Sequence, residues 1–377
     1  MANTSQFTTT LKKILIFTAL IAGFLTGSLV KAAEAPEALA RDIYFRAKVV
    51  VVEKEEVTEE LTEPLLTQTI RLLLTSGDES GKEVIVEYQV RGAQSTEKKL
   101  QPNDTVVVDK NILPDGTTNY YVTEPFRLNA LAWLGFLFFA ITIGIAGRRG
   151  LFAFFGLITT FAIIVWFIIP QISQGASPFL ICLVGAALIA GVSLGLGHGF
   201  TRQTAVALGS IVITIVLAMI LSVVAVSGAH LFGLGSEEAY YLQYGFASTI
   251  NLRGLLLGGI IIGVLGVLDD VAMAQVAVVA ELRAANPLLS PRELYGRASR
   301  IGREHIVAVV NTLVLAYVGA AFPLVLMFQT FTTPWWVTLN TELISEEVVR
   351  TLIGSISLVA AVPIATALAV WYYHRKI

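Results

Sequence analysis

Two adjacent aspartates, Asp269 and Asp270, interrupt a long apolar stretch of the sequence. Ionisable side chains are costly inside a membrane, where they usually mark the path of an ion or a proton. If the stretch is one helix, Asp269 lies about 25 Å from Leu252, near the inner limit of the hydrocarbon layer. Because neighbouring residues on a helix point about 100° apart, at least one carboxylate should face the interior of a helix bundle. The pair is therefore a candidate ion or proton site.

A second interpretation places the two acids at the end of the membrane-spanning segment. The helix would then stop at the cytoplasmic interface, and residues Val271–Ala280 would continue as an amphipathic surface segment. Those residues carry no charge, so the acids interrupt an apolar run rather than close it, which favours the site. Gly266, just before the pair, would also permit a break in the helix that exposes backbone carbonyls as ligands.

Asn311 and Thr312 lie at a similar depth on the following apolar segment. Both are about 10 Å from His305, the expected cytoplasmic end of that segment. Two carboxylates with an amide and a hydroxyl from a facing helix make an oxygen-rich site, which suits a proton or a hard cation. Polar residues of this kind also join helices without binding an ion, so a packing role stays open. The sequence does not identify a metal.

Glycines precede the acids along the same segment. They strip side-chain bulk from one side of the helix and would let a neighbouring backbone approach closely. The predicted packing positions are Gly254, Gly258, Gly259, Gly263 and Gly266.

The acids belong to one of seven apolar segments, each near the roughly 20 residues with which a helix crosses a bilayer. Of the 377 residues, 55% are hydrophobic and only 14% are charged, whereas soluble domains contain roughly a quarter charged residues. The chain is therefore predicted to be an α-helical polytopic membrane protein. The expected spans are Leu128–Ala146, Leu151–Ile169, Pro178–Leu196, Thr204–Val226, Leu252–Val276, His305–Phe328 and Val349–Tyr372.

The charges of alternate loops predict the orientation of these helices, because basic loops stay in the cytoplasm. One set of loops and the C-terminus contain Arg148, Arg149, Arg202, Arg283, Arg292, Arg297, Arg300, Arg303, Arg375 and Lys376. The opposite loops contain mainly acids, namely Glu237, Glu238, Glu342, Glu346 and Glu347. The C-terminus should therefore be cytoplasmic, and the chain before the first span should lie outside.

The long basic loop, residues 281–304, contains a capping-box pattern. Ser290 is followed by Pro291 and then by Glu293, which predicts that a short amphipathic surface helix begins there. Its arginines are expected to face solvent or lipid headgroups, and docking of a cytoplasmic partner is the alternative. Trp335 and Trp336, in an outer loop, look like interfacial anchors.

The N-terminal region combines an export signal with a small β-domain. Lys12 and Lys13 precede an apolar run and small residues, so residues 1–35 are predicted to be a signal peptide or an uncleaved signal anchor. Either would export residues 36–127. That segment contains five short alternating runs separated by turns at residues 76–81 and 114–116. It is predicted to close into an OB-like barrel, which would protect its strand edges.

Several chemical functions are disfavoured. An aspartyl protease needs two carboxylates that face each other, usually from different helices, whereas these two are adjacent on one. The string Gly191-Val-Ser193-Leu-Gly195 matches a nucleophile elbow but lies within a predicted helix. No Gly-x4-Gly-Lys-Ser/Thr phosphate-binding loop occurs. A single cysteine, Cys182, cannot form an intrachain disulfide or a Cys-based metal site. We therefore expect neither an enzyme nor a bound cofactor, and a net charge of −2 gives no sign of nucleic-acid binding.

Several motifs resemble the membrane core of the bacterial YibE/F family. They are Gly266-Val-Leu-Asp-Asp-Val-Ala-Met-Ala, Glu281-Leu, Asn286-Pro, Gly302-Arg-Glu and Val310-Asn-Thr-Leu-Val-Leu-Ala-Tyr-Val-Gly319. The resemblance covers residues 127–376 and implies a transmembrane domain over residues 128–377 of an inner (plasma) membrane protein, often suspected of transport. Many relatives have a single acid that aligns with Asp270, so the resemblance supports Asp270 more firmly than Asp269. It implies no established substrate.

Two functions remain in competition. The first is a secondary transporter or permease-like protein, coupled to protons or cations through the intramembrane acids. The second is a non-transporting membrane scaffold whose β-domain binds an envelope partner. Besides the lipid bilayer, the expected partners are a small solute or ion and, for the scaffold, an envelope protein. The oligomeric state is not indicated by the sequence.

Overall fold

The computed structural model describes residues 43–60, 63–92, 97–113, 116–244, 250–330 and 333–374. The predicted signal or anchor in residues 1–35 lies outside these ranges. The chain divides into two units near residue 141, so most of the first apolar helix groups with the strands. The predicted boundary at Arg127 instead separates the strands from that helix.

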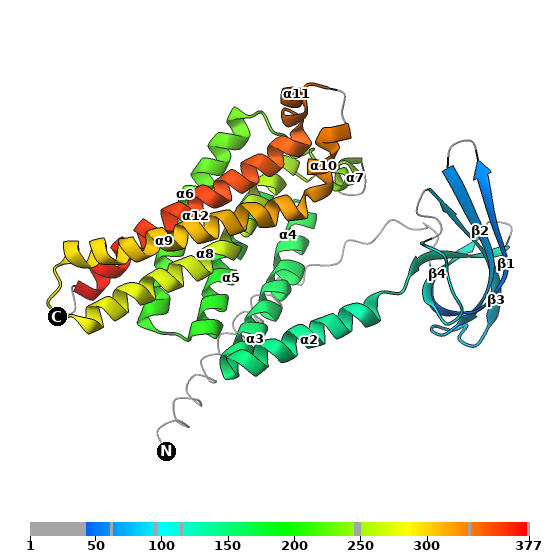
Figure 1. The fold of residues 1–377 in the computed structure, drawn as a ribbon, viewed down its shortest axis with the longest axis horizontal. Coiled ribbons are helices and arrows are strands. Elements are labelled where there is room, and N and C mark those ends of the chain that lie inside the picture. The colour runs from blue at the N-terminus through cyan, green and yellow to red at the C-terminus, as the bar shows by residue number, and fades with distance from the viewer. Residues whose placement is uncertain are drawn as a thin grey trace, which may run out of the picture. The chain divides into compact units, whose positions relative to one another are not determined.

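Five antiparallel strands form the N-terminal domain, as predicted. The sheet order is β3-β2-β1-β4-β5, so the first strand is central and pairs with both β2 and β4. The edge strands β3 and β5 approach each other, which leaves a nearly closed barrel (Figure 1). This arrangement agrees with the expected OB-like barrel. The strands are β1 (Ile43–Glu60), β2 (Glu63–Leu74), β3 (Glu83–Arg91), β4 (Thr105–Ile112) and β5 (Thr118–Pro125).

Alternate residues of these strands point into the barrel and form its apolar core. Gly77, in the turn between β2 and β3, has a φ of +77°, and a Cβ there would lie 2.7 Å from the Phe45 ring. The turn therefore needs glycine to cover the end of the core. The buried core residues include Phe45, Ala47, Val49, Ile70, Leu72, Leu74, Val84, Val86, Val106 and Val108.

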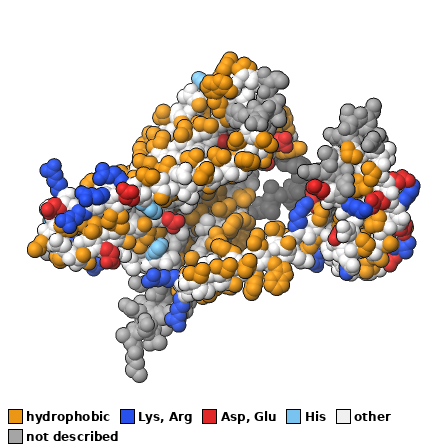
Figure 2. Space-filling view, viewed as in Figure 1, with side chains coloured by type: hydrophobic (Ala, Val, Ile, Leu, Met, Phe, Trp, Pro, Cys, Tyr) orange, Lys and Arg blue, Asp and Glu red, His pale blue; other side chains and the backbone are white. Residues whose placement is uncertain are grey.

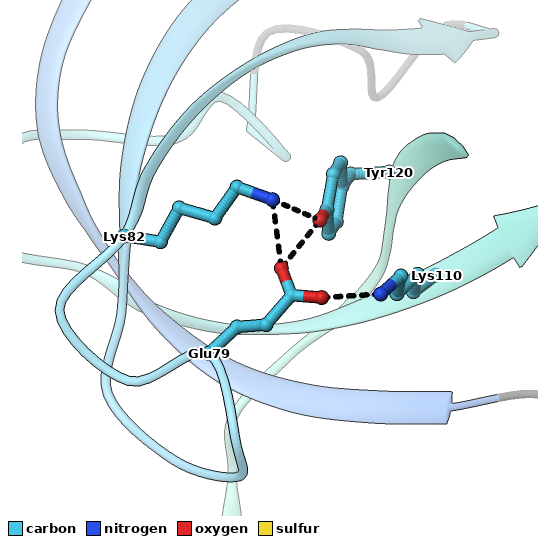
Figure 3. A network of polar contacts seen from close by, with 4 residues as sticks. All are labelled: Glu79, Lys82, Lys110 and Tyr120. Atoms are coloured by element: carbon cyan, nitrogen blue, oxygen red, sulfur yellow. Dashed lines mark hydrogen bonds and ion pairs between the residues drawn. The ribbon is translucent and has the colours of Figure 1, made fainter. Parts of the chain in front are cut away.

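A polar cluster ties the β2–β3 turn to the last two strands (Figure 3). The Glu79 carboxylate forms an ion pair with Lys110 of β4 and accepts hydrogen bonds from Tyr120 of β5 at 2.6 Å and from Lys82 at 2.9 Å. The Lys110, Tyr120 and Lys82 hydrogen bonds lower the pKa of Glu79 to about 2. The folded domain therefore binds the ionised form of this carboxylate.

We predict that the β-domain, excised as residues 36–127, folds alone and gives a β-type circular dichroism spectrum, because its core needs no lipid.

The pKa of Glu79 is about 2 in the fold and 4.5 when unperturbed. Its contribution to the free energy of unfolding is thus present above pH 4.5 and lost as the pH falls toward 2. Glu79→Gln should lower the denaturation midpoint at pH 7 and reduce the loss of stability between pH 4.5 and 2. A random-coil spectrum of the excised domain would contradict the prediction that it folds alone. The same loss of stability between pH 4.5 and 2 in the wild-type domain and in Glu79→Gln would contradict the role of Glu79.

Seven helices in the described part of the chain are long and apolar enough to cross a membrane, which confirms the predicted multi-pass architecture. Their bounds are α2 (Leu128–Ala146), the continuous α3 (Arg148–Ile163), η1 (Ile164–Ile168) and α4 (Ile169–Ser173), then α5 (Pro178–His198), α6 (Arg202–Gly228), α8 (Leu252–Ala285), α9 (Pro291–Ala320) and α12 (Glu342–His374). Shorter helices α7 (Glu237–Tyr244), α10 (Phe322–Thr330) and α11 (Trp335–Leu339) lie between them. The η1 segment is a π-helical turn just before Pro170, which cannot donate a backbone hydrogen bond.

Helices α6, α8 and α12 contact one another extensively and form the centre of the bundle, with α5 against α8 and α3 against α5. Ile211, Ile260 and Leu358 of the central helices are fully buried. In contrast, α2 has no buried residue, and only 6% of the residues in the most apolar stretch of α9 are buried. Figure 2 shows hydrophobic side chains across the visible outer surface of the helices. This distribution is expected where lipid, rather than water, surrounds the bundle.

Four details of the helices differ from the expectations. Helix α8 continues unbroken from Leu252 to Ala285, so neither a break at Gly266 nor a separate surface segment after the acids is observed. Gly266 lowers the stability of the helix by only about 1 kcal/mol relative to alanine. Burial of the neighbouring Leu265 and Leu268 offsets that loss. Residues Val271–Ala280 are largely buried in the bundle.

The predicted surface helix of the basic loop is likewise not separate. The capping box at Ser290 and Glu293 is present, but the helix that it begins, α9, continues to Ala320. No proline interrupts this stretch, so nothing ends the helix before the membrane segment. The span that was expected to reach Phe328 ends at Ala320 instead, and α10 begins two residues later, with Pro323 near its start.

Candidate functional site

Asp269 lies near the middle of α8, and its side chain is close to Ser193 of α5. The aspartate is partly buried, and its Oδ1 atom is buried without a hydrogen-bond partner among the described residues. A buried polar atom without a partner is costly, so such atoms often mark a site for an ion, a proton or water. Asp269 is therefore the centre of the candidate site.

The other predicted members of the site do not join this centre. Asp270 is exposed on the outside of α8, as the 100° offset between neighbouring helical residues requires. Asn311 and Thr312 are both exposed on α9. Thr312 donates its hydroxyl hydrogen bond to its own helix, at the Ala308 carbonyl 2.9 Å away. In the described part of the chain, no hydrogen bond links Asn311 or Thr312 to either aspartate.

Ser193 was considered in the sequence only as part of a nucleophile-elbow string, and its link to Asp269 was missed. The structure confirms that it lies in a helix. Small residues around it let α3 approach, since a Cβ at Gly156 of α3 would lie 3.9 Å from the Ser193 Cα. The sequence shows a serine within a run of small residues on one apolar segment and an acid on another. Residue spacing alone could not predict that these two side chains lie close together.

The glycines before the acids do not all pack on one side of α8. A Cβ at Gly258 would lie 2.6 Å from the Cys182 Sγ of α5, and one at Gly254 would lie 3.4 Å from Pro178. A Cβ at Gly263 would instead lie 3.2 Å from the Tyr317 hydroxyl of α9. A Cβ at Gly259 or Gly266 would meet no atom within 4 Å. Two of the five glycines thus make the close approach between α5 and α8.

A second polar junction, which the sequence analysis also missed, lies six residues beyond Asp269. Gln275 is 4% exposed and donates hydrogen bonds to the Ala298 carbonyl of α9 at 3.0 Å and to the Thr366 hydroxyl of α12 at 2.7 Å. A Cβ at Gly302 would lie 2.9 Å from the Gln275 amide, which leaves room for glycine alone. This junction fixes α8, α9 and α12 to one another near the end of the bundle that holds the arginines.

The opposite end of the bundle is fixed by two carboxylates of α12. Glu342 accepts hydrogen bonds from the successive backbone N–H groups of Phe232, Gly233 and Leu234, at 2.5, 2.9 and 3.3 Å. Glu346, one turn later and 7% exposed, accepts one from Gly235 at 3.0 Å. Successive N–H groups of this kind form an anion-binding concavity. Here it holds the loop after α6 onto the start of α12.

The comparison with known protein families decides what kind of chain this is. Residues 134–375 match the family described as YibE/F-like protein. The chain belongs to the YibE/F-like family. The match covers the membrane helices from within α2 to the end of α12, but not the β-domain. No curated protein and no solved structure matches the chain.

Within this YibE/F-like bundle, the donor set limits the chemistry. The described residues contain no group of three or more His, Cys, Asp or Glu side chains placed to hold a metal. Ca²⁺ and similar hard cations need six or more oxygen ligands. One carboxylate and one hydroxyl can instead exchange a proton or hold a small, partly hydrated cation.

Proposed function

We propose that the protein is a secondary transporter whose coupling ion, a proton or a small cation, binds at Asp269. The observation that carries the proposal is the Oδ1 atom of Asp269, which is buried without a hydrogen-bond partner among the described residues. This carboxylate lies close to Ser193 on a second membrane helix. A charge inside an apolar bundle reduces stability, so its presence favours a function that needs it. The protein would act by binding and movement, without enzyme chemistry or a cofactor.

The geometry suggests how binding could be coupled to movement. Asp269 is on α8 and Ser193 is on α5, so a small shift between these two helices changes what surrounds the carboxylate. The close contacts at Gly254 and Gly258 hold α5 and α8 together. A movement of one helix along the other therefore requires less change in packing than a separation of the two. A neutral, protonated Asp269 fits the closed arrangement, and opening toward either side releases the ion.

Reconstitution of the full-length protein tests this function. Proteoliposomes containing an internal pH dye would be given an imposed pH gradient and a panel of small solutes. We expect one class of solute to change the internal pH only when the protein is present. If no solute and no cation produces a flux, the membrane scaffold becomes the better interpretation, with the β-domain binding an envelope partner.

We also propose that the β-domain is extracytoplasmic and the C-terminus is cytoplasmic in a bacterial inner membrane, because the arginines are concentrated in alternate loops. A reporter that is active only in the cytoplasm should give a signal when fused after Arg375 and none when inserted near Gly116. A reporter active only outside should give the reverse pattern. The same compartment at both positions would contradict this topology.

A further inference from the structure

Three arginines form a strip along the exposed side of the first turns of α9. Arg292, Arg300 and Arg303 are all exposed, and their spacing of eight and three residues keeps them on one face of the helix. Figure 2 shows basic side chains, with some acidic ones among them, at the end of the bundle where α8 and α9 meet. Buried residues of the same turns, Leu294 and Ala298, lie on the opposite face.

The charge of this strip is not neutralised within the described part of the chain. Among the residues that the structure describes, no acid lies within ion-pair distance of Arg292, Arg300 or Arg303. The nearby Glu293 is engaged in the capping box, where its carboxylate accepts hydrogen bonds from the Ser290 backbone at 3.0 Å and hydroxyl at 2.7 Å. The three guanidinium groups are therefore available to an external anion.

A gap between side chains, here called the notch, lies at the exposed Gly296 in the middle of the strip. Gly296 is four residues after Arg292 and four before Arg300, and a Cβ at Gly296 would meet no atom within 4 Å. The Cα atoms of these two arginines are about 12 Å apart along the helix, so both side chains can converge above the glycine. Arginine forks match the oxygens of a phosphate group. The notch leaves space for such a group against the backbone.

The position of the strip along α9 indicates where its anion comes from. Counting roughly 20 residues back from Ala320 places the limit of the hydrocarbon layer near Ile301. Arg300 and Arg303 then lie at the headgroup level, and Arg292 lies about 12 Å farther out. Along the same side, Val307 is 72% exposed within the apolar part of the helix. A phospholipid could thus place its headgroup on the arginines and its chains along α9.

From this geometry we infer that α9 binds the phosphate headgroup of an anionic phospholipid in the notch formed by Arg292, Gly296 and Arg300, with Arg303 beside it. The notch distinguishes this site from the general preference of basic loops for an anionic membrane, because a glycine contributes no charge. The inference does not depend on the transport function.

The test uses the full-length protein purified in a neutral detergent. Binding of phosphatidylglycerol and of phosphatidylcholine with the same acyl chains would be measured by native mass spectrometry. We expect tighter binding of phosphatidylglycerol to the wild type. Replacing Arg292, Arg300 and Arg303 with Gln should weaken it by roughly fivefold per arginine, the effect expected for one basic residue near an anionic surface.

Gly296→Leu is the decisive variant, because it fills the notch and leaves the charge unchanged. It should also lose most of the preference for phosphatidylglycerol, while its thermal unfolding midpoint should equal or exceed that of the wild type, since a Cβ there meets no neighbour. The control is Arg149→Gln with Arg202→Gln, which removes two exposed arginines from the same end of other helices and should keep the preference. Wild-type binding by Gly296→Leu, or equal losses in the control and the triple variant, would overturn the inference.

Discussion

Asp269→Asn is expected to reduce ion-coupled flux in proteoliposomes by roughly tenfold or more, while the protein still inserts and folds. Asparagine has nearly the same shape and can still bond to Ser193, but it cannot gain or lose a proton or balance the charge of a cation. Ser193→Ala should have a smaller effect in the same direction. It removes a hydroxyl that can donate a hydrogen bond to the carboxylate, and such a bond to a charged group contributes about 1.5–3 kcal/mol.

Asp270→Asn and Asn311→Ala are the matched controls for this prediction. Both residues are exposed on their helices, and neither contacts Asp269 through a hydrogen bond in the described part of the chain. Both variants should keep most of the flux. This prediction favours Asp269, whereas the family resemblance supports Asp270 more firmly, so the two pairs of variants decide between them. Full flux in Asp269→Asn, or its loss only in Asp270→Asn, would show that Asp269 is not the coupling residue.

Gly258→Leu should destabilise the bundle more than any exposed substitution in α8. A Cβ at this position would lie 2.6 Å from the Cys182 Sγ and 3.2 Å from the Pro178 carbonyl oxygen. Cys182 is 2% exposed, so it has no free space into which to move. Overpacking of this kind typically costs about 1–3 kcal/mol, and a whole leucine side chain should reach the upper end of that range. A lower midpoint of thermal unfolding in detergent would measure the effect.

The adjacent Gly259 provides the control. It is exposed, and a Cβ there would meet no atom within 4 Å. Gly259→Leu should therefore leave the unfolding midpoint unchanged or raise it, because leucine favours a helix over glycine by nearly 1 kcal/mol. Equal loss of stability in the two variants would mean that α8 tolerates no side chain on either face, and the contact between α5 and α8 would not explain the effect.

The sequence by itself determined the class of the protein and the number of its membrane helices. The hydrocarbon layer of a bilayer is about 30 Å thick, and backbone groups inside it must form hydrogen bonds within the protein. Apolar runs of about 20 residues are therefore predicted to be helices, whichever helices they pack against. The strands of the β-domain were equally predictable, since residues such as Val84 and Val86 alternate with polar ones and the turns contain Gly77 and Gly81. The capping box at Ser290 likewise depends only on residues within one turn.

The partners of the polar residues were decided only by the tertiary structure. Asp269 and Ser193 are 76 residues apart, and Gln275 and Thr366 are 91 apart. Their pairing depends on which faces of α5, α8 and α12 turn toward each other. Hydrophobic periodicity normally predicts which face of a helix is buried. Helices that are apolar on all sides show almost no such periodicity. The packing of glycines and side chains therefore sets their rotation, and with it which of two adjacent acids is buried.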